Sequence, residues 1–83
     1  MITIDIKYIA GELTPGLENG KYEIEEGLTV QSLIDWLACK HEVVIPPNNF
    51  KLMYPLFDGK PIQLSDQITR SGTLHICRII VGG

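Results

Sequence analysis

The sequence lacks several features that would assign a protein to a class at once. Only two of its 83 residues are cysteines, Cys39 and Cys77, too few for the disulfide framework of a small secreted domain. No basic stretch followed by an apolar segment opens the chain, and no apolar run approaches the roughly 20 residues of a transmembrane helix. We therefore expect a cytoplasmic protein with reduced thiols and no membrane contact.

Positive charge is scarce as well. Seven Lys and Arg residues stand against ten Asp and Glu residues, which gives a net charge of −3, and the basic residues are scattered singly. Because nucleic acids and anionic membranes attract a basic surface, we expect the chain to bind neither. The composition is otherwise that of a globular protein, with 45% hydrophobic and 20% charged residues. It predicts one small domain over residues 1–83, and we expect a monomer.

The first third of the chain alternates in the manner of a strand pair. Met1–Ile9 places apolar and polar residues on opposite faces, and Lys21–Glu25 alternates again. Between them, Ala10–Gly20 carries three glycines and a proline, which predicts a loose hairpin connection.

A helix is predicted next, because the apolar spacing changes. Thr29 stands at the N-cap position, and the helical spacing is carried by Val30, Leu33, Ile34, Leu37 and Ala38. Pro46 and Pro47 prevent this helix from continuing past Ile45.

The remaining elements are shorter. We expect strands at Phe50–Tyr54, Pro61–Gln63 and Thr73–Ile80, a tight turn at Asp58-Gly59, and one helical turn, capped by Ser65 or Asp66, in "LSDQITRSG". The order strand, strand, helix, strand, short strand, strand predicts an α+β fold, with one long helix packed on one face of a mixed sheet of four to five strands.

Four stretches carry a family resemblance. They are "IPPNNFKLMY" (residues 45–54), "FDGK" (57–60), "LSD" followed by Ile68 (64–68) and "TLHICRIIVGG" (73–83). In their order and spacing they resemble ubiquitin and its relatives, the β-grasp family. The resemblance implies a ubiquitin-like β-grasp domain over residues 1–83, with residues 79–83 as an extended C-terminal tail. The chain departs from ubiquitin at Ile79 and Val81, where ubiquitin has arginines, and this apolar segment is more similar to the sulfur carriers of thiamin and molybdopterin synthesis.

The resemblance also implies a function for Gly82 and Gly83. An E1-like adenylating enzyme would use ATP to activate the Gly83 carboxylate, which is then passed as a thioester, through an E2-like enzyme, to an isopeptide bond on a target protein. Glycine suits this role because a Cβ beside the reacting carbonyl would crowd the partner's active site. A modifier of this kind is itself no enzyme and binds no cofactor. Two alternatives stay open: a sulfur carrier activated as a C-terminal thiocarboxylate, served by a sulfur-transfer enzyme, and a non-conjugated binding module.

Two surfaces are predicted to meet partners. By resemblance, Ile9, Met53, His75 and Cys77 match the exposed hydrophobic patch of ubiquitin, and Arg78, Ile79, Ile80 and Val81 match the tail that an activating enzyme contacts. Lys60 matches a lysine through which ubiquitin forms chains, although a solvated turn lysine is the simpler interpretation.

Other chemistry is not favoured. Cys39-x-His41 and His75-x-Cys77 hold four zinc-ligand types, but the strand and helix periods place the two pairs on opposite faces of the sheet, so we expect no metal site. Cys77 beside His75 lacks an orienting acid and is not expected to act as a nucleophile. Trp36 lies off the main apolar stripe of the helix and is expected to be partly exposed.

Overall fold

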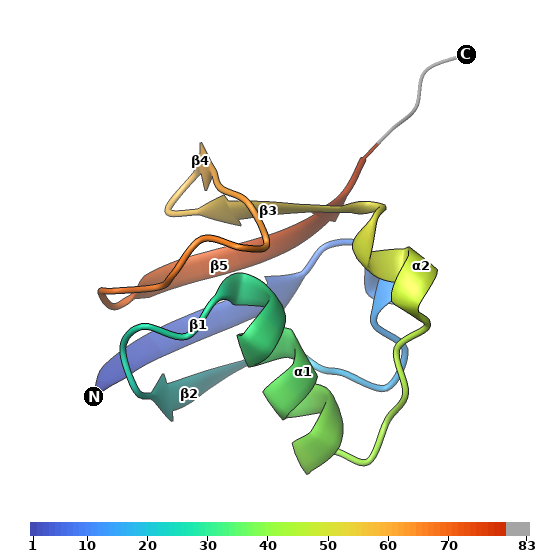
Figure 1. Ribbon diagram of the computed structural model, residues 1–83, viewed down its shortest axis with the longest axis horizontal. Coiled ribbons are helices and arrows are strands. Elements are labelled where there is room, and N and C mark those ends of the chain that lie inside the picture. The colour runs from blue at the N-terminus through green and yellow to red at the C-terminus, as the bar shows by residue number, and fades with distance from the viewer. Residues whose placement is uncertain (80–83) are drawn as a thin grey trace.

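The computed structural model describes residues 1–79, which form a five-stranded mixed sheet in the order β2-β1-β5-β3-β4 (Figure 1). The strands are β1 (Ile2–Tyr8), β2 (Gly20–Ile24), β3 (Met53–Phe57), β4 (Lys60–Pro61) and β5 (Gly72–Arg78). The first and last strands lie parallel at the centre, and the other pairs are antiparallel. This arrangement confirms the predicted α+β class.

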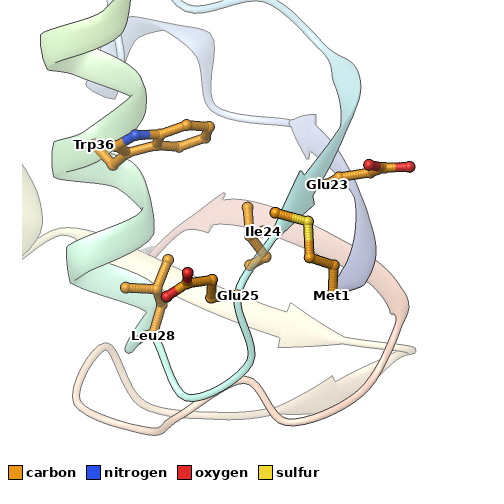
Figure 2. Close-up of a pocket in the computed structure, with 6 residues that line it drawn as sticks. All are labelled: Met1, Glu23, Ile24, Glu25, Leu28 and Trp36. Carbon is orange, nitrogen blue, oxygen red and sulfur yellow. The ribbon is translucent and has the colours of Figure 1, made fainter.

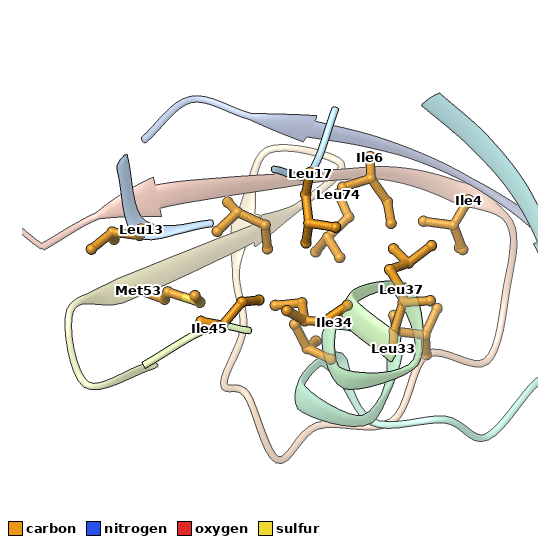
Figure 3. Close-up of a cluster of buried hydrophobic side chains, with 14 of the residues drawn as sticks. Ile4, Ile6, Leu13, Leu17, Leu33, Ile34, Leu37, Ile45, Met53 and Leu74 are labelled. Atoms are coloured by element: carbon orange, nitrogen blue, oxygen red, sulfur yellow. The ribbon is translucent and has the colours of Figure 1, made fainter. Parts of the chain in front are cut away.

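The core lies between the sheet and helix α1 (Val30–Lys40), which crosses one face of the sheet (Figure 1). Alternate residues of β1 and β5 meet one stripe of the helix, and the side chains that this contact buries fully are Ile4, Ile6, Leu74, Ile76, Val30, Leu33, Ile34 and Leu37 (Figure 3). Each such side chain contributes about 1.5–3 kcal/mol relative to exposure, so this contact fixes which face of the sheet is left outward.

Helix α1 begins and ends with satisfied backbone groups. The Thr29 hydroxyl accepts a hydrogen bond from the Ser32 N–H at 3.0 Å, as an N-cap should. At the other end Glu42 has a φ of 56°, and the Val43 N–H donates to the Ala38 carbonyl at 2.9 Å. These bonds form a Schellman motif, which ends the helix at Lys40, before the prolines are reached.

The third strand differs from the prediction. Residues Pro47–Phe50 form a short helix, α2, that begins with Pro47, and the strand runs over Met53–Phe57 instead of Phe50–Tyr54. Pro55 is tolerated inside the strand because its carbonyl, which accepts from the Ile62 N–H at 3.1 Å, faces the sheet edge and its missing N–H breaks no bond to β5.

Two connections also differ from expectation. The segment after β1 is not loose, because a 3₁₀ turn, η1 (Gly11–Leu13), leads into the buried side chains of Leu13 and Leu17. The stretch "LSDQITRSG" contains no helical turn. Ile68 instead pairs its backbone with Gly27 and Leu28 at 2.8 Å and buries its side chain.

Candidate functional site

The face of the sheet opposite α1, called here the outer face, presents a row of residues across its three inner strands. The pairing of β3 with β5 sets Tyr54 beside Cys77 and Leu56 beside His75. Ile9 follows β1 directly, and its N–H donates to the Ile76 carbonyl at 3.0 Å, so its backbone lies beside the C-terminal end of β5. Ile9, Tyr54, Leu56, His75 and Cys77 form a surface that we call the sheet-face patch.

Met53 does not belong to this surface. It is only 4% exposed and lies with the core side chains (Figure 3), whereas its neighbour Tyr54 is 41% exposed. The surface assignment of Met53 is therefore wrong, because the strand begins three residues later than predicted and its alternation is shifted. Ile9, at 65% exposure, is the most exposed member of the patch, while His75 and Cys77 are half-buried.

The last described residues are anchored at the end of the sheet where β3 begins. Arg78 lies opposite Met53 in the register, and its guanidinium Nη1 is 3.3 Å from Glu12 Oε1 of η1. The Ile79 N–H donates to the Leu52 carbonyl at 2.7 Å, yet the Ile79 side chain is 41% exposed. The predicted tail residues Ile80, Val81, Gly82 and Gly83 lie outside the described residues.

The turn that carries Lys60 is tightly held. Asp58 and Gly59 both have positive φ, 50° and 82°, which is the two-residue hairpin turn that the dipeptide predicts. The Asp58 carboxylate accepts hydrogen bonds from the Thr73 N–H at 2.9 Å and from Arg70 Nη1 at 2.6 Å. These bonds, the Thr73 one foremost, lower the pKa of Asp58 below its usual value. Lys60 itself is exposed on β4, and its use as a linkage site stays a prediction.

No protein-family model and no curated protein matches the sequence. Solved structures do match. Small archaeal modifier protein 1 from Haloferax volcanii superposes with a TM-score of 0.69 at 16% identity, over 96% of this chain and 100% of the other. Molybdopterin converting factor subunit 1 from Pyrococcus furiosus gives a TM-score of 0.64 at 17% identity, with the same coverage of both chains.

The chain has the ubiquitin-like β-grasp fold. The resemblance seen in the four sequence stretches is thus confirmed as a likeness of fold across nearly the whole chain. In this β-grasp chain the sheet-face patch and the anchored end of β5 are adjacent, since Cys77 and Arg78 are consecutive residues of one strand.

The two Cys–His pairs of the sequence lie in different parts of the fold. Cys39 and His41 lie at the end of α1, where the His41 ring contacts Tyr22, whereas His75 and Cys77 lie on the outer face. Within residues 1–79, no three His, Cys, Asp or Glu side chains come together in a group that could hold a metal ion. Neither helix of the same residues has the length and apolar character needed to cross a membrane.

The sequence interpretation missed Tyr54 and Leu56 as members of the patch. A signal for them was present, because a two-residue Asp58-Gly59 turn requires the strand before it to reach Phe57. Counting back in steps of two from Phe57 gives Pro55 and Met53 on one face and leaves Tyr54 and Leu56 on the other. Since all five residues are apolar, hydrophobicity alone could not decide which set was buried.

Proposed function

We propose that this chain is a ubiquitin-like protein modifier whose Gly83 carboxylate is adenylated by an E1-like enzyme. In this reaction a Gly83 carboxylate oxygen attacks the α-phosphate of ATP and releases pyrophosphate. A cysteine thiolate of the enzyme then attacks the acyl adenylate, releases AMP and forms a thioester. A lysine amine of a target protein finally displaces that thiol, through an E2-like enzyme, and forms an isopeptide bond. The proposal requires that Gly83 carry the free carboxylate of the active form.

The observation that carries the proposal is the placement of the segment leading to Gly82 and Gly83. Strand β5 is bonded on both sides, to β1 and to β3, and is held at its end by Arg78 and Ile79. The four residues after Ile79 can span at most about 14 Å when extended. The position from which these residues extend is therefore set by the sheet. A glycine has no Cβ that could obstruct its carbonyl in a partner's active site.

The sheet-face patch is proposed as the docking surface for the activating enzyme. It holds the exposed side chains of Ile9 and Tyr54 near the C-terminal end of β5, where Tyr54 pairs with the half-buried Cys77. Residues 79–83, called here the arm, follow this strand directly. A contiguous apolar surface of this kind is typical of protein interfaces. Docking here would hold the arm close to the enzyme's nucleotide site. The structural likeness to small archaeal modifier protein 1 supports this class of function.

A second function, that of a sulfur carrier, is favoured by a specific observation. In the sequence, the three residues before the glycines, Ile79, Ile80 and Val81, are all apolar, and the fold is shared with molybdopterin converting factor subunit 1. In that case a sulfur donor, in place of the enzyme thiol, attacks the acyl adenylate. The product is a thiocarboxylate at Gly83, formed with loss of AMP. The two functions share the adenylation step and differ in the group that then receives the acyl carbon.

Mass spectrometry of cells that make the tagged protein tests the proposal. Arg78 is the last basic residue of the chain, so trypsin would leave the segment 79–83 attached to each modified lysine. A modifier gives this branched remnant on target lysines. A sulfur carrier gives none, but the intact protein gains the mass of one sulfur in place of one oxygen.

Deletion of Gly83 is the matched control. It removes the reacting carbon while leaving the residues of the sheet and core untouched, so both products should disappear with no change in thermal unfolding. If neither product forms with the full chain, the proposal is wrong and a non-conjugated binding module remains.

A further inference from the structure

A second surface feature lies away from the sheet-face patch. Between the end of β2 and the side of α1, a pocket of about 290 Å³ opens to solvent. Its lining comprises Met1, Glu23, Ile24, Glu25, Leu28 and Trp36 (Figure 2). This volume is at the lower limit for a small-molecule site and suits a single long side chain better than a cofactor.

The indole of Trp36 is held in place although it contributes little to the core. It is 40% exposed, and the Tyr22 ring meets it nearly perpendicularly at 6.4 Å between centroids. The Lys40 ammonium, one helical turn further along α1, lies 5.0 Å from the ring centroid. On the opposite side the indole faces Leu28 and Glu25 across the pocket (Figure 2). A rigid aromatic surface is therefore left uncovered there.

Two of the six residues that line the pocket are glutamates, Glu23 and Glu25, and the Lys40 ammonium lies near its indole. The ion pairs among residues 1–79 are Arg70–Asp58 and Arg78–Glu12, so neither Glu23 nor Glu25 is neutralised by a pair in this part of the chain. Figure 2 shows the Glu25 carboxylate beside Leu28, across the pocket from the indole, and the Glu23 side chain pointing outward at the rim. An occupant with a cationic end would be attracted by the carboxylates and by the indole face.

We propose that this pocket binds an arginine side chain of a partner protein. The planar guanidinium stacks on the free face of Trp36 and donates hydrogen bonds to the Glu25 carboxylate. The three methylene groups of the arginine lie against Ile24 and Leu28. Arginine fits better than lysine because its guanidinium stacks on aromatic rings and donates two parallel bonds to one carboxylate. This proposal is independent of the reaction at Gly83.

The test uses fluorescence, since Trp36 is the only tryptophan in the chain. The folded full-length protein is titrated with acetyl-Ala-Arg-Ala-amide and, separately, with the same peptide carrying citrulline, which keeps the shape of arginine but has no charge. We expect a saturable change in Trp36 emission with the arginine peptide and at least about threefold weaker binding of the citrulline peptide. Two-dimensional NMR should place the shifted amides at residues 23–28 and around Trp36.

Two variants distinguish binding in the pocket from a general attraction of the peptide to negative charge. Glu25→Gln removes the carboxylate that faces the indole, and Glu26→Gln removes the same charge from the next residue, which does not line the pocket. Glu25→Gln should weaken the arginine peptide at least about threefold, while Glu26→Gln should leave its affinity nearly unchanged. Equal affinity for the two peptides, equal effects of the two variants, or no saturable change would each overturn the proposal.

Discussion

At the scale of single residues, one position decides what the outer face can do. Met53 and Tyr54 are adjacent and both apolar, yet the first is 4% exposed and the second 41%. Because strand residues alternate between faces, the two side chains serve different purposes, Met53 in the core and Tyr54 in the sheet-face patch.

This assignment predicts opposite effects for two neighbouring alanine variants. Met53→Ala should lower the free energy of unfolding by about 2–4 kcal/mol, because it leaves a cavity among core side chains. Tyr54→Ala should change it by less than about 1 kcal/mol while raising the KM of the activating enzyme for this protein. Urea denaturation and adenylation kinetics measure both. If Met53→Ala were as stable as the wild type but were activated less efficiently, the assignment of Met53 to the core would be wrong.

Asp58 is expected to make the stability of the folded protein depend on pH. Its pKa in the folded protein lies below the ordinary 3.8, chiefly through the bond from the Thr73 N–H and then the one from Arg70. The Asp58 carboxylate is therefore protonated more readily in the unfolded chain than in the folded protein. Its ionised form stabilises the folded state fully above pH 3.8, and this stabilisation is lost as the pH falls through the pKa of the folded protein.

The variant Asp58→Asn keeps a side chain that tolerates the positive φ of this position but removes the charge. Its Tm should lie below that of the wild type at neutral pH, and the difference should shrink as the pH is lowered toward about 2. Thermal unfolding of the two proteins across this range measures the difference. A gap in Tm that stays constant with pH would show that the Asp58 charge does not stabilise the turn.

At the scale of elements, the end of α1 is the clearest case of local strain. Glu42 occupies the left-handed position of the Schellman motif, with a φ of 56°, where glycine is the usual residue. Its carboxylate is also placed close to the negative end of the helix dipole. Both features cost stability without any visible benefit to the packing.

Glu42→Gly should therefore raise the free energy of unfolding by about 1 kcal/mol. Glu42→Ala is the matched control, since it removes the same charge but retains the Cβ, and it should give a clearly smaller gain. Chemical denaturation of the three proteins tests this. If the alanine and glycine variants are equally stable, the gain comes from the charge and the backbone of residue 42 is not strained.

The elements also show what sequence could and could not predict. Period-2 alternation located β1 and β2, and the helical spacing after Thr29 located α1, because each of these elements has one face buried and the other exposed. The same reasoning failed for β3, where both faces are apolar, and for the segment around Ile68. There, long-range backbone pairing to Gly27 and Leu28 overrides the local preference for a helical turn.

At the scale of the whole molecule, the fold places two potential contact regions on different sides. The sheet-face patch lies on the outer face beside the base of the arm, whereas the Trp36 pocket lies between α1 and the edge strand β2. Motif resemblance pointed to the first region through Ile9, His75 and Cys77. The second was not visible in sequence, because Glu25, Leu28 and Trp36 come together only when the helix packs on the sheet.

We propose above all that Gly83 is the reacting end of this protein. Intact-mass analysis after incubation with ATP, magnesium and an E1-like adenylating enzyme known to be active on its own substrate tests this proposal. We predict an ATP-dependent product formed at Gly83, either a thiol-sensitive thioester with the enzyme or a thiocarboxylate, and no such product when Gly83 is deleted. An unchanged mass with every active enzyme tried, or equal reaction of the deleted chain, would contradict the claim.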